Sequence, residues 1–160
     1  MIVCFLAGCS SSPRSEEAKP RCAGEGTYLL VATKPHQLLA CSKGRAIHQM
    51  PVALGRGGVG KSKEGDNKTP LGTYSLSSPR ASSRFGIFVP IGYPTADQAK
   101  AGLTGSDVGI HGPARLFKWA GSLNLLFDWT QGCIAVESDE QIKTLSDWIG
   151  QVQPPHVVIE

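Results

Sequence analysis

Two residues of this sequence, Cys133 and His111, have the types and surroundings that nucleophilic catalysis needs. Cys133 follows a glycine and precedes the apolar run 134–136, so its thiol is expected at the start of a strand, near free backbone amides. His111 is expected at the end of another short strand, 108–110. An imidazole within reach of a thiol can take its proton, and the thiolate is the nucleophile. The pair therefore predicts a cysteine nucleophile with a histidine base.

Neighbouring glycines offer the other parts of such a site. The amides of Gly132 and Cys133 are suited to hold a developing oxyanion, and the carbonyl of Gly112 is suited to fix the tautomer of His111. Each residue also has a plainer interpretation, because a lone cysteine is more often a small buried hydrophobe and a lone histidine is more often structural. Spacing alone therefore gives a modest indication of catalysis.

The glycine-rich segment 55–62 matches the phosphate-binding pattern G-x-x-x-x-G-K-[ST] at every position. That motif needs a helix to begin at its lysine–serine step, because the helix N-terminus supplies amides to the phosphates. Residues 63–72 contain two glycines, an Asp-Asn pair and a proline, which do not form a helix. We therefore expect a mobile glycine-rich loop beside a cleft instead of a nucleotide site.

The elements that would position these residues are mostly short strands, so the sequence predicts a mainly β fold with one or two short helices. The expected strands are 27–33, 37–41, 46–54, 73–76, 85–91, 108–110, 134–136 and 156–159. The expected helices are 95–101 and 138–148. Thr95 and Ser138 are their expected N-caps.

The composition is that of one globular domain. The chain has 160 residues, of which 41% are hydrophobic and 18% are charged, and the net charge of +3 is small. No basic stripe with interleaved aromatics suggests a nucleic-acid partner. No apolar run reaches the roughly 18 residues of a spanning helix. The histidines show no metal-ligand spacing, so neither a metal nor another cofactor is expected.

The first 26 residues are interpreted as an export signal and a tether. Residues 1–8 are apolar and end in small residues, as at the end of a secretory signal peptide. Residues 6–9 resemble the bacterial lipobox, which implies a lipid on Cys9, followed by a flexible tether over 9–26 and a domain over 27–160. We therefore expect a lipid-anchored protein on the periplasmic side of a bacterial membrane. The alternative is an apolar N-terminus that packs in the fold.

The chain has five cysteines, and each has an expected place. Cys4 leaves with the signal and Cys9 is the lipid site. Cys22 and Cys41 would remain in an oxidising compartment, where they can pair. A hairpin centred near 35 does not place them directly opposite each other, so their pairing stays open. If they pair, Cys133 is the single free thiol.

Five motifs occur in an order that resembles the L,D-transpeptidase catalytic domain (YkuD type) of bacterial cell-wall enzymes. They are Gly60-Lys61, Gly65-Asp66, Thr69-Pro70-Leu71-Gly72-Thr73-Tyr74, Ile110-His111-Gly112 and Gly132-Cys133-Ile134. The resemblance covers about residues 27–160. It implies a β-sandwich-like fold and a covalent acyl-enzyme mechanism on peptidoglycan stem peptides. By this resemblance Cys133 is the nucleophile and His111 is its base.

The sequence departs from the family's common S-H-G-C, because residues 130–133 are Thr-Gln-Gly-Cys and the second histidine is missing. This variant and the segment 93–97 look like the branch of murein-cleaving members, which hydrolyse the bond between the wall and its attached lipoprotein. Three functions stay open. They are an L,D-transpeptidase-type transferase, a murein amidase or peptidase that releases wall-attached lipoprotein, and a non-catalytic peptidoglycan-binding lipoprotein.

Five residues are candidates for binding the substrate, namely Lys61, Tyr93, Arg115, Trp119 and Gln131. Lys61 and Arg115 have the charge to meet a substrate carboxylate, although each is more often a solvated cation. Trp119 lies between the two catalytic motifs, where it would form a wall or lid of the cleft. Tyr93 and Gln131 belong to the segments that resemble the murein-cleaving branch, and Tyr93 is also interpreted as a scaffold residue.

Overall fold

The structure of the chain is a computed structural model that describes residues 20–160. The expected signal segment, Cys9 and most of the tether lie outside the described residues. The strands of the described part are β1 (Thr27–Ala32), β2 (Gln37–Ser42), β3 (Arg45–Ala53), β4 (Gly72–Ser75), β5 (Arg80–Ser82), β6 (Gly86–Pro90), β7 (Gly109–His111), β8 (Ile134–Val136) and β9 (His156–Ile159). Its helices are α1 (Ala96–Lys100), the 3₁₀ helix η1 (Arg115–Leu125) and α2 (Asp139–Val152).

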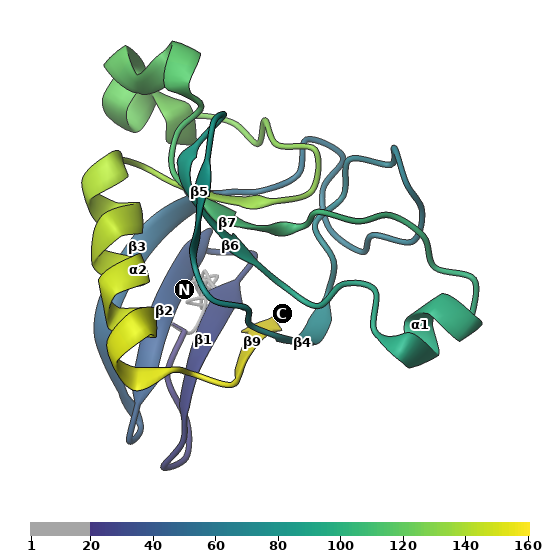
Figure 1. Cartoon of the computed structure of the whole chain (residues 1–160), viewed down its shortest axis with the longest axis horizontal. Coiled ribbons are helices and arrows are strands. Elements are labelled where there is room, and N and C mark those ends of the chain that lie inside the picture. Colours follow the sequence, from purple (N-terminus) through teal and green to yellow (C-terminus); the bar gives the residue numbers. More distant parts are fainter. Residues whose placement is uncertain (1–19) are drawn as a thin grey trace, which may run out of the picture.

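The strands form one curled sheet in the order β4-β9-β1-β2-β3-β8-β7-β6-β5, and α2 lies along one side of it (Figure 1). β3 joins the two halves, because most of it pairs with β2 while Val52 and Ala53 pair with β8. β8 runs parallel to β7, with Ala135 opposite His111. This pairing brings Cys133, just before β8, next to Gly109 at the start of β7 and two residues from His111, although the two segments are far apart in the sequence.

One hydrophobic core lies between the sheet and α2. The helix contributes its buried face, which consists of Ile142, Leu145, Trp148 and Ile149. Burying a side chain of this size stabilises the fold by about 1.5–3 kcal/mol, so α2 is fixed mainly by packing. Ser138 caps this helix by accepting from the amide of Gln141, and Thr95 caps α1 in a capping box, as the sequence predicts.

The mainly β fold with two α-helices is confirmed, and the predicted sandwich is a single continuous sheet that curls around its core. β3 is long enough to belong to both halves, so no break separates them. Two elements were not predicted. β5 has only three polar or small residues, and η1 lies in a segment without a clear helical period. The second predicted helix also extends to Val152.

The glycine-rich segment folds back on itself and contains no helix. The Gly57 amide donates to the Asn67 carbonyl at 3.0 Å, and the Thr69 amide donates to the Gly58 carbonyl at 2.9 Å. A Cβ on Gly55 would overlap the carbonyl of Asn67, so the two arms approach too closely for a side chain there. The segment therefore has no helix N-terminus at the position that a P-loop requires, in agreement with the expectation from its residues.

Cys22 and Cys41 form a disulfide that ties the segment before β1 to β2. Within the hairpin Tyr28 stands opposite Cys41, so the register places the two cysteines apart, as expected. Cys22 lies ahead of β1, and its Cα lies 5.5 Å from that of Cys41, so the two thiols can bond. Leu30 and Leu39 pack around the disulfide in a second, smaller apolar cluster.

Among residues 20–160, no helix has the length and apolar character needed to cross a membrane.

Candidate active site

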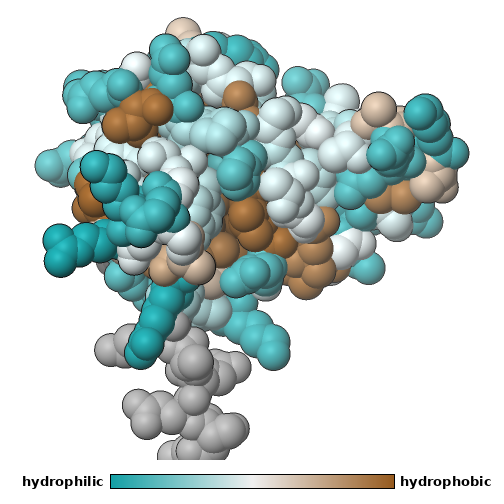
Figure 2. All heavy atoms as spheres, turned by 90° about the horizontal axis from the view of Figure 1, so that it is seen from below, coloured by the Kyte–Doolittle hydropathy of each residue, from teal (hydrophilic) through white to brown (hydrophobic). Residues whose placement is uncertain are grey.

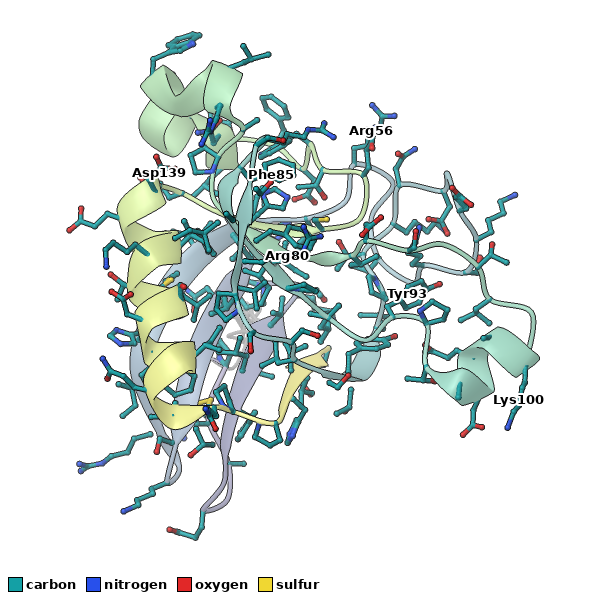
Figure 3. The ribbon with its side chains drawn as sticks, viewed as in Figure 1. Arg56, Arg80, Phe85, Tyr93, Lys100 and Asp139 are labelled. Carbon is teal, nitrogen blue, oxygen red and sulfur yellow. A yellow bond between two sulfur atoms is a disulfide. The ribbon has the colours of Figure 1, made fainter. Side chains whose placement is uncertain are left out.

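A cavity of about 840 Å³ contains both expected catalytic residues, Cys133 and His111, in its lining. Four segments surround it: the glycine-rich loop, the β5–β6 hairpin, residues 105–108 before β7, and residues 129–133 before β8. Figure 3 shows Arg80 and Phe85 of the hairpin near the middle of the molecule and Arg56 on the loop beside them. The site is therefore assembled at the N-terminal ends of the parallel strands β7 and β8.

Buried Thr130 fixes the backbone around Cys133. Its hydroxyl donates to the Cys133 carbonyl at 2.7 Å and accepts from the Gly132 amide at 3.1 Å. Gly132 has a φ of +125°, and a Cβ there would lie 2.7 Å from the carbonyl of Lys68, so only glycine fits before the cysteine. The Cys133 thiol donates to the Asp107 carbonyl, with an Sγ to oxygen distance of 3.6 Å.

His111 is held in one orientation and one tautomer. Its side chain is buried, and Nδ1 lies 2.6 Å from the carbonyl of Gly112, which assigns the proton to Nδ1 and leaves Nε2 as the proton acceptor. The ring of Phe85 stacks on the imidazole at 3.7 Å, and Trp129 meets it edge-on at 5.7 Å. A Cβ on Gly112 would lie 3.0 Å from Ile142, so a side chain there would displace the carbonyl that orients His111.

Burial dominates the electrostatics of both groups. It lowers the pKa of His111 to about 4; the hydrogen bond to Gly112 opposes this shift, and the charge of Arg84 adds to it. Burial raises the pKa of the Cys133 thiol above its ordinary value, against the opposing effects of a backbone hydrogen bond from Gly109 and the charge of Arg84. At neutral pH the resting site therefore holds a thiol and a neutral imidazole, and only the neutral imidazole can accept a proton.

Lys61, one of the expected substrate-binding residues, lines the cavity but is engaged in a buried ion pair. Its ammonium lies 2.9 Å from Asp66 Oδ1 and also donates to the Lys63 carbonyl. Asp66 accepts further hydrogen bonds from the amides of Ser62, Lys63 and Lys68. Burial raises the pKa of Asp66, but these hydrogen bonds outweigh it and hold that pKa well below its usual range. The pair organises the loop that lies behind the nucleophile.

Gln131 and Tyr93 were expected to bind substrate and lie in different places. Gln131 is exposed and lines the cavity beside Cys133. Tyr93 is buried, and its hydroxyl donates to the carbonyls of Lys61 and Thr104 at 3.3 and 3.4 Å. Tyr93 is absent from the lining of the cavity, so its contacts are those of a scaffold residue that supports the loop.

Arg115 and Trp119 belong to η1, and neither lines the cavity. The side chain of Trp119 is 80% exposed, and its indole N–H donates to the Leu116 carbonyl within the same element. Arg115 nevertheless adjoins the wall of the cavity, because its backbone amide donates to the Arg84 carbonyl at 3.0 Å. The aromatic wall expected from this stretch of sequence is supplied by Trp129, which contacts His111 directly.

Sequence reasoning missed several residues of the cavity. They are Arg56, Arg80, Arg84, Phe85, Phe88 and Asp107. Phe85 was assigned only to a strand, because its contact with His111 crosses from one hairpin to another strand of the sheet. The two arginines of the segment 80–85 were visible as residues, but no local pattern indicates that this hairpin lines the cavity.

The domain as a whole matches a known protein family. The family model for the L,D-transpeptidase catalytic domain (YkuD) matches residues 26–159, which is most of the chain. This chain belongs to the L,D-transpeptidase catalytic-domain family. No curated protein is similar enough in sequence to count as a match. Within the matched residues, His111 lies in the motif Ile110-His111-Gly112, and Cys133 lies in Gly132-Cys133-Ile134.

Solved structures share the fold of this L,D-transpeptidase domain. Pgp2 of Campylobacter jejuni, described as a helical cell shape determining protein, is 24% identical over 84% of this chain, with a TM-score of 0.66. Bd1075 of Bdellovibrio bacteriovorus is 22% identical over 86%, with a TM-score of 0.59. An L,D-transpeptidase of Xylanimonas cellulosilytica is 17% identical over 86%, with a TM-score of 0.52. This chain spans 47%, 48% and 62% of their respective lengths.

Proposed function

We propose that this domain is an exported enzyme that cleaves peptidoglycan stem peptides through a thioester on Cys133. The observation that carries the proposal is the cavity in which the Cys133 thiol lies at the start of β8 and His111, with Nε2 free to accept a proton, lies at the end of β7. Membership of the L,D-transpeptidase family supplies the substrate class. The bond to be cleaved joins an L-centre to a D-centre in the stem peptide.

The geometry supports a sequence of proton transfers through one histidine. As Cys133 Sγ attacks the carbonyl carbon, its proton passes to His111 Nε2. The Gly132 amide already donates to Thr130, so the Cys133 amide is the donor left to stabilise the oxyanion. The C–N bond then breaks, and the imidazolium gives its proton to the leaving amine. A second nucleophile, deprotonated by His111, attacks the thioester and restores the thiol.

Incubation of the protein with purified muropeptides tests this proposal. We expect wild type to remove the terminal D-residue and to show a thioester mass on the peptide that contains Cys133. Cys133→Ala and His111→Asn should each lose at least about a thousandfold in rate, while His48→Asn, a matched histidine change on β3, should keep it. If wild type leaves the muropeptides intact and forms no adduct, the proposed enzymatic function is refuted. The alternative, a non-catalytic peptidoglycan-binding protein, is then favoured.

Product masses assign the second nucleophile. Incorporation of water identifies the hydrolytic enzyme of the murein-cleaving branch, and incorporation of an amine identifies the transpeptidase. Gln131, which stands in the cavity where the common family motif has a second histidine, cannot act as a base. Both reactions therefore rely on His111 for the proton of the acceptor.

We also propose that the protein is exported and anchored by a lipid on Cys9. The Cys22–Cys41 disulfide supports export, because such bonds persist in oxidising compartments. Labelling cells with a radioactive fatty acid tests the anchor. Wild type should carry the label and sediment with membranes, while Cys9→Ala should do neither. An unlabelled wild-type protein would rule out the anchor without affecting the chemistry of Cys133.

A further inference from the structure

Two arginines of the β5–β6 hairpin line the cavity and take no part in the mechanism above. Arg84 Cζ lies 5.1 Å from the ring centre of Phe85, and that ring stacks on His111 at 3.7 Å. Arg80 Cζ lies 4.9 Å from the ring centre of Phe88, which is directly opposite Arg80 in the β5–β6 pairing. Phe88 is in turn opposite His111 across β6 and β7. Both guanidinium groups therefore lie over phenylalanine rings that stack on the imidazole of His111. Figure 3 labels Arg80 and Phe85 of this hairpin.

Arg84 is available for a ligand. Within residues 20–160, no carboxylate forms an ion pair with Arg84, and its cation–π contact with Phe85 uses the face of the guanidinium and leaves its N–H groups free. Arg80 lies 3.9 Å from Asp107, but both side chains are largely exposed, so this pair is weak and easily exchanged for another anion. Lys61, by contrast, is already neutralised by Asp66.

The position of these arginines beside His111 places them on the leaving-group side of the scissile bond. His111 protonates the leaving amine in the proposed mechanism, so a group bound beside it belongs to the leaving residue. When that residue is the C-terminal amino acid of the donor, its carboxylate is one carbon away from the amine that departs. A planar guanidinium binds such a carboxylate through two parallel N–H···O bonds.

We propose that Arg84, assisted by Arg80, binds the free carboxylate of the leaving group and thereby makes this domain selective for donors that end in a free amino acid. The inference rests on the proposed function. The arginine site favours donors in which the leaving amine and a free carboxylate are attached to the same carbon. It disfavours donors in which the leaving amine lies at the end of a long side chain of a larger leaving group. Arg84 is thus a substrate-binding residue that determines specificity.

A pair of synthetic stem tetrapeptides, one with a free terminal carboxylate and one with a terminal amide, tests the selectivity. We expect wild type to prefer the free acid. Arg84→Gln should lower kcat/KM for the acid by about 10- to 100-fold and leave that for the amide within about twofold, because it removes charge-assisted hydrogen bonds. Arg84→Lys should recover part of the loss, and Arg45→Gln, an exposed arginine change at the far end of β3, should have no effect. Equal losses on both peptides in Arg84→Gln would overturn the proposal.

Alkylation of Cys133 tests the anion site without any peptidase activity. The rates for anionic iodoacetate and neutral iodoacetamide are measured on the whole protein by mass spectrometry of the peptide that contains Cys133. The rate with iodoacetate divided by the rate with iodoacetamide should fall about fivefold or more in Arg84→Gln and stay unchanged in Arg45→Gln. Added salt should lower the same ratio in wild type, because it screens the attraction between the arginine and the anionic reagent. An unchanged ratio in Arg84→Gln would overturn the anion site. Inactivity on both peptides with a normal change in this ratio would refute the proposed function alone.

Discussion

Replacement of Asp66 by asparagine should destabilise the domain strongly, because it leaves the Lys61 ammonium buried without a countercharge. The side chains of Lys61 and Asp66 are only 5% and 7% exposed, and the carboxylate accepts four hydrogen bonds in addition to the charge of its partner. Removal of one partner of a buried pair costs about 3–5 kcal/mol, and we expect about 3 kcal/mol because this pair borders a water-accessible cavity. That is a large share of the 5–15 kcal/mol typical of a folded domain.

Urea and thermal unfolding measure the effect. Asp66→Asn should lower Tm by about 6–12 °C, whereas Asp97→Asn, which breaks an exposed ion pair with Lys100, should change it little. Lys61→Met should cost less than Asp66→Asn, because the carboxylate keeps its amide donors. The double variant should be less destabilised than the sum of the two single variants. A loss of unfolding free energy below about 1 kcal/mol in Asp66→Asn, together with a double variant whose loss equals the sum of the two single variants, would show that the pair does not stabilise the fold.

The pH dependence of unfolding shows how protonation of Asp66 is coupled to the stability of the fold. The pKa of Asp66 is depressed in the folded state, so the carboxylate contributes stability above the ordinary aspartate pKa of about 3.9 and loses it as the pH falls through the folded value. The difference in unfolding free energy between wild type and Asp66→Asn should therefore be complete at pH 7 and shrink below about pH 4. A difference that grows on acidification would contradict the assignment.

Three further predictions concern the nucleophile, its backbone and the disulfide. The rate of Cys133 alkylation by iodoacetamide should still rise with pH at the ordinary thiol value of 9.0, because burial raises its pKa; a plateau near neutral pH would show a preformed thiolate–imidazolium pair instead. Gly132→Ala should abolish turnover, since its φ of +125° and the Lys68 carbonyl exclude a Cβ, whereas Gly150→Ala in α2 should preserve turnover and stabilise the fold by about 0.5–1 kcal/mol. Turnover in Gly132→Ala at the wild-type rate would show that the backbone there adapts. Replacement of both Cys22 and Cys41 by serine should lower the unfolding free energy by about 3 kcal/mol, as expected for a separation of 19 residues, and leave activity at 25 °C intact; equal stabilities in denaturant would contradict this.

Much of the fold was accessible from local patterns. The first two strands, β9 and the capped helices follow from apolar runs, turns and cap residues that act within a few positions of one another. β5 and η1 were missed, because neither has a clear period and each is held by neighbours distant in sequence. The disulfide was left open for a similar reason, since the hairpin register says nothing about a cysteine that precedes the hairpin.

The sequence by itself determined the chemistry available to this protein. A glycine before Cys133 and a glycine after His111 were visible as residues, and the order of the motifs indicated the L,D-transpeptidase family, which the family match confirms. Only the tertiary structure decided which side chains surround that pair. The parallel pairing of β7 with β8 and the stacking of the β5–β6 hairpin on His111 bring Arg84 to the cavity, while Arg115 is absent from its lining. Such contacts depend on strand register and on the curl of the sheet, which no local pattern of residues specifies.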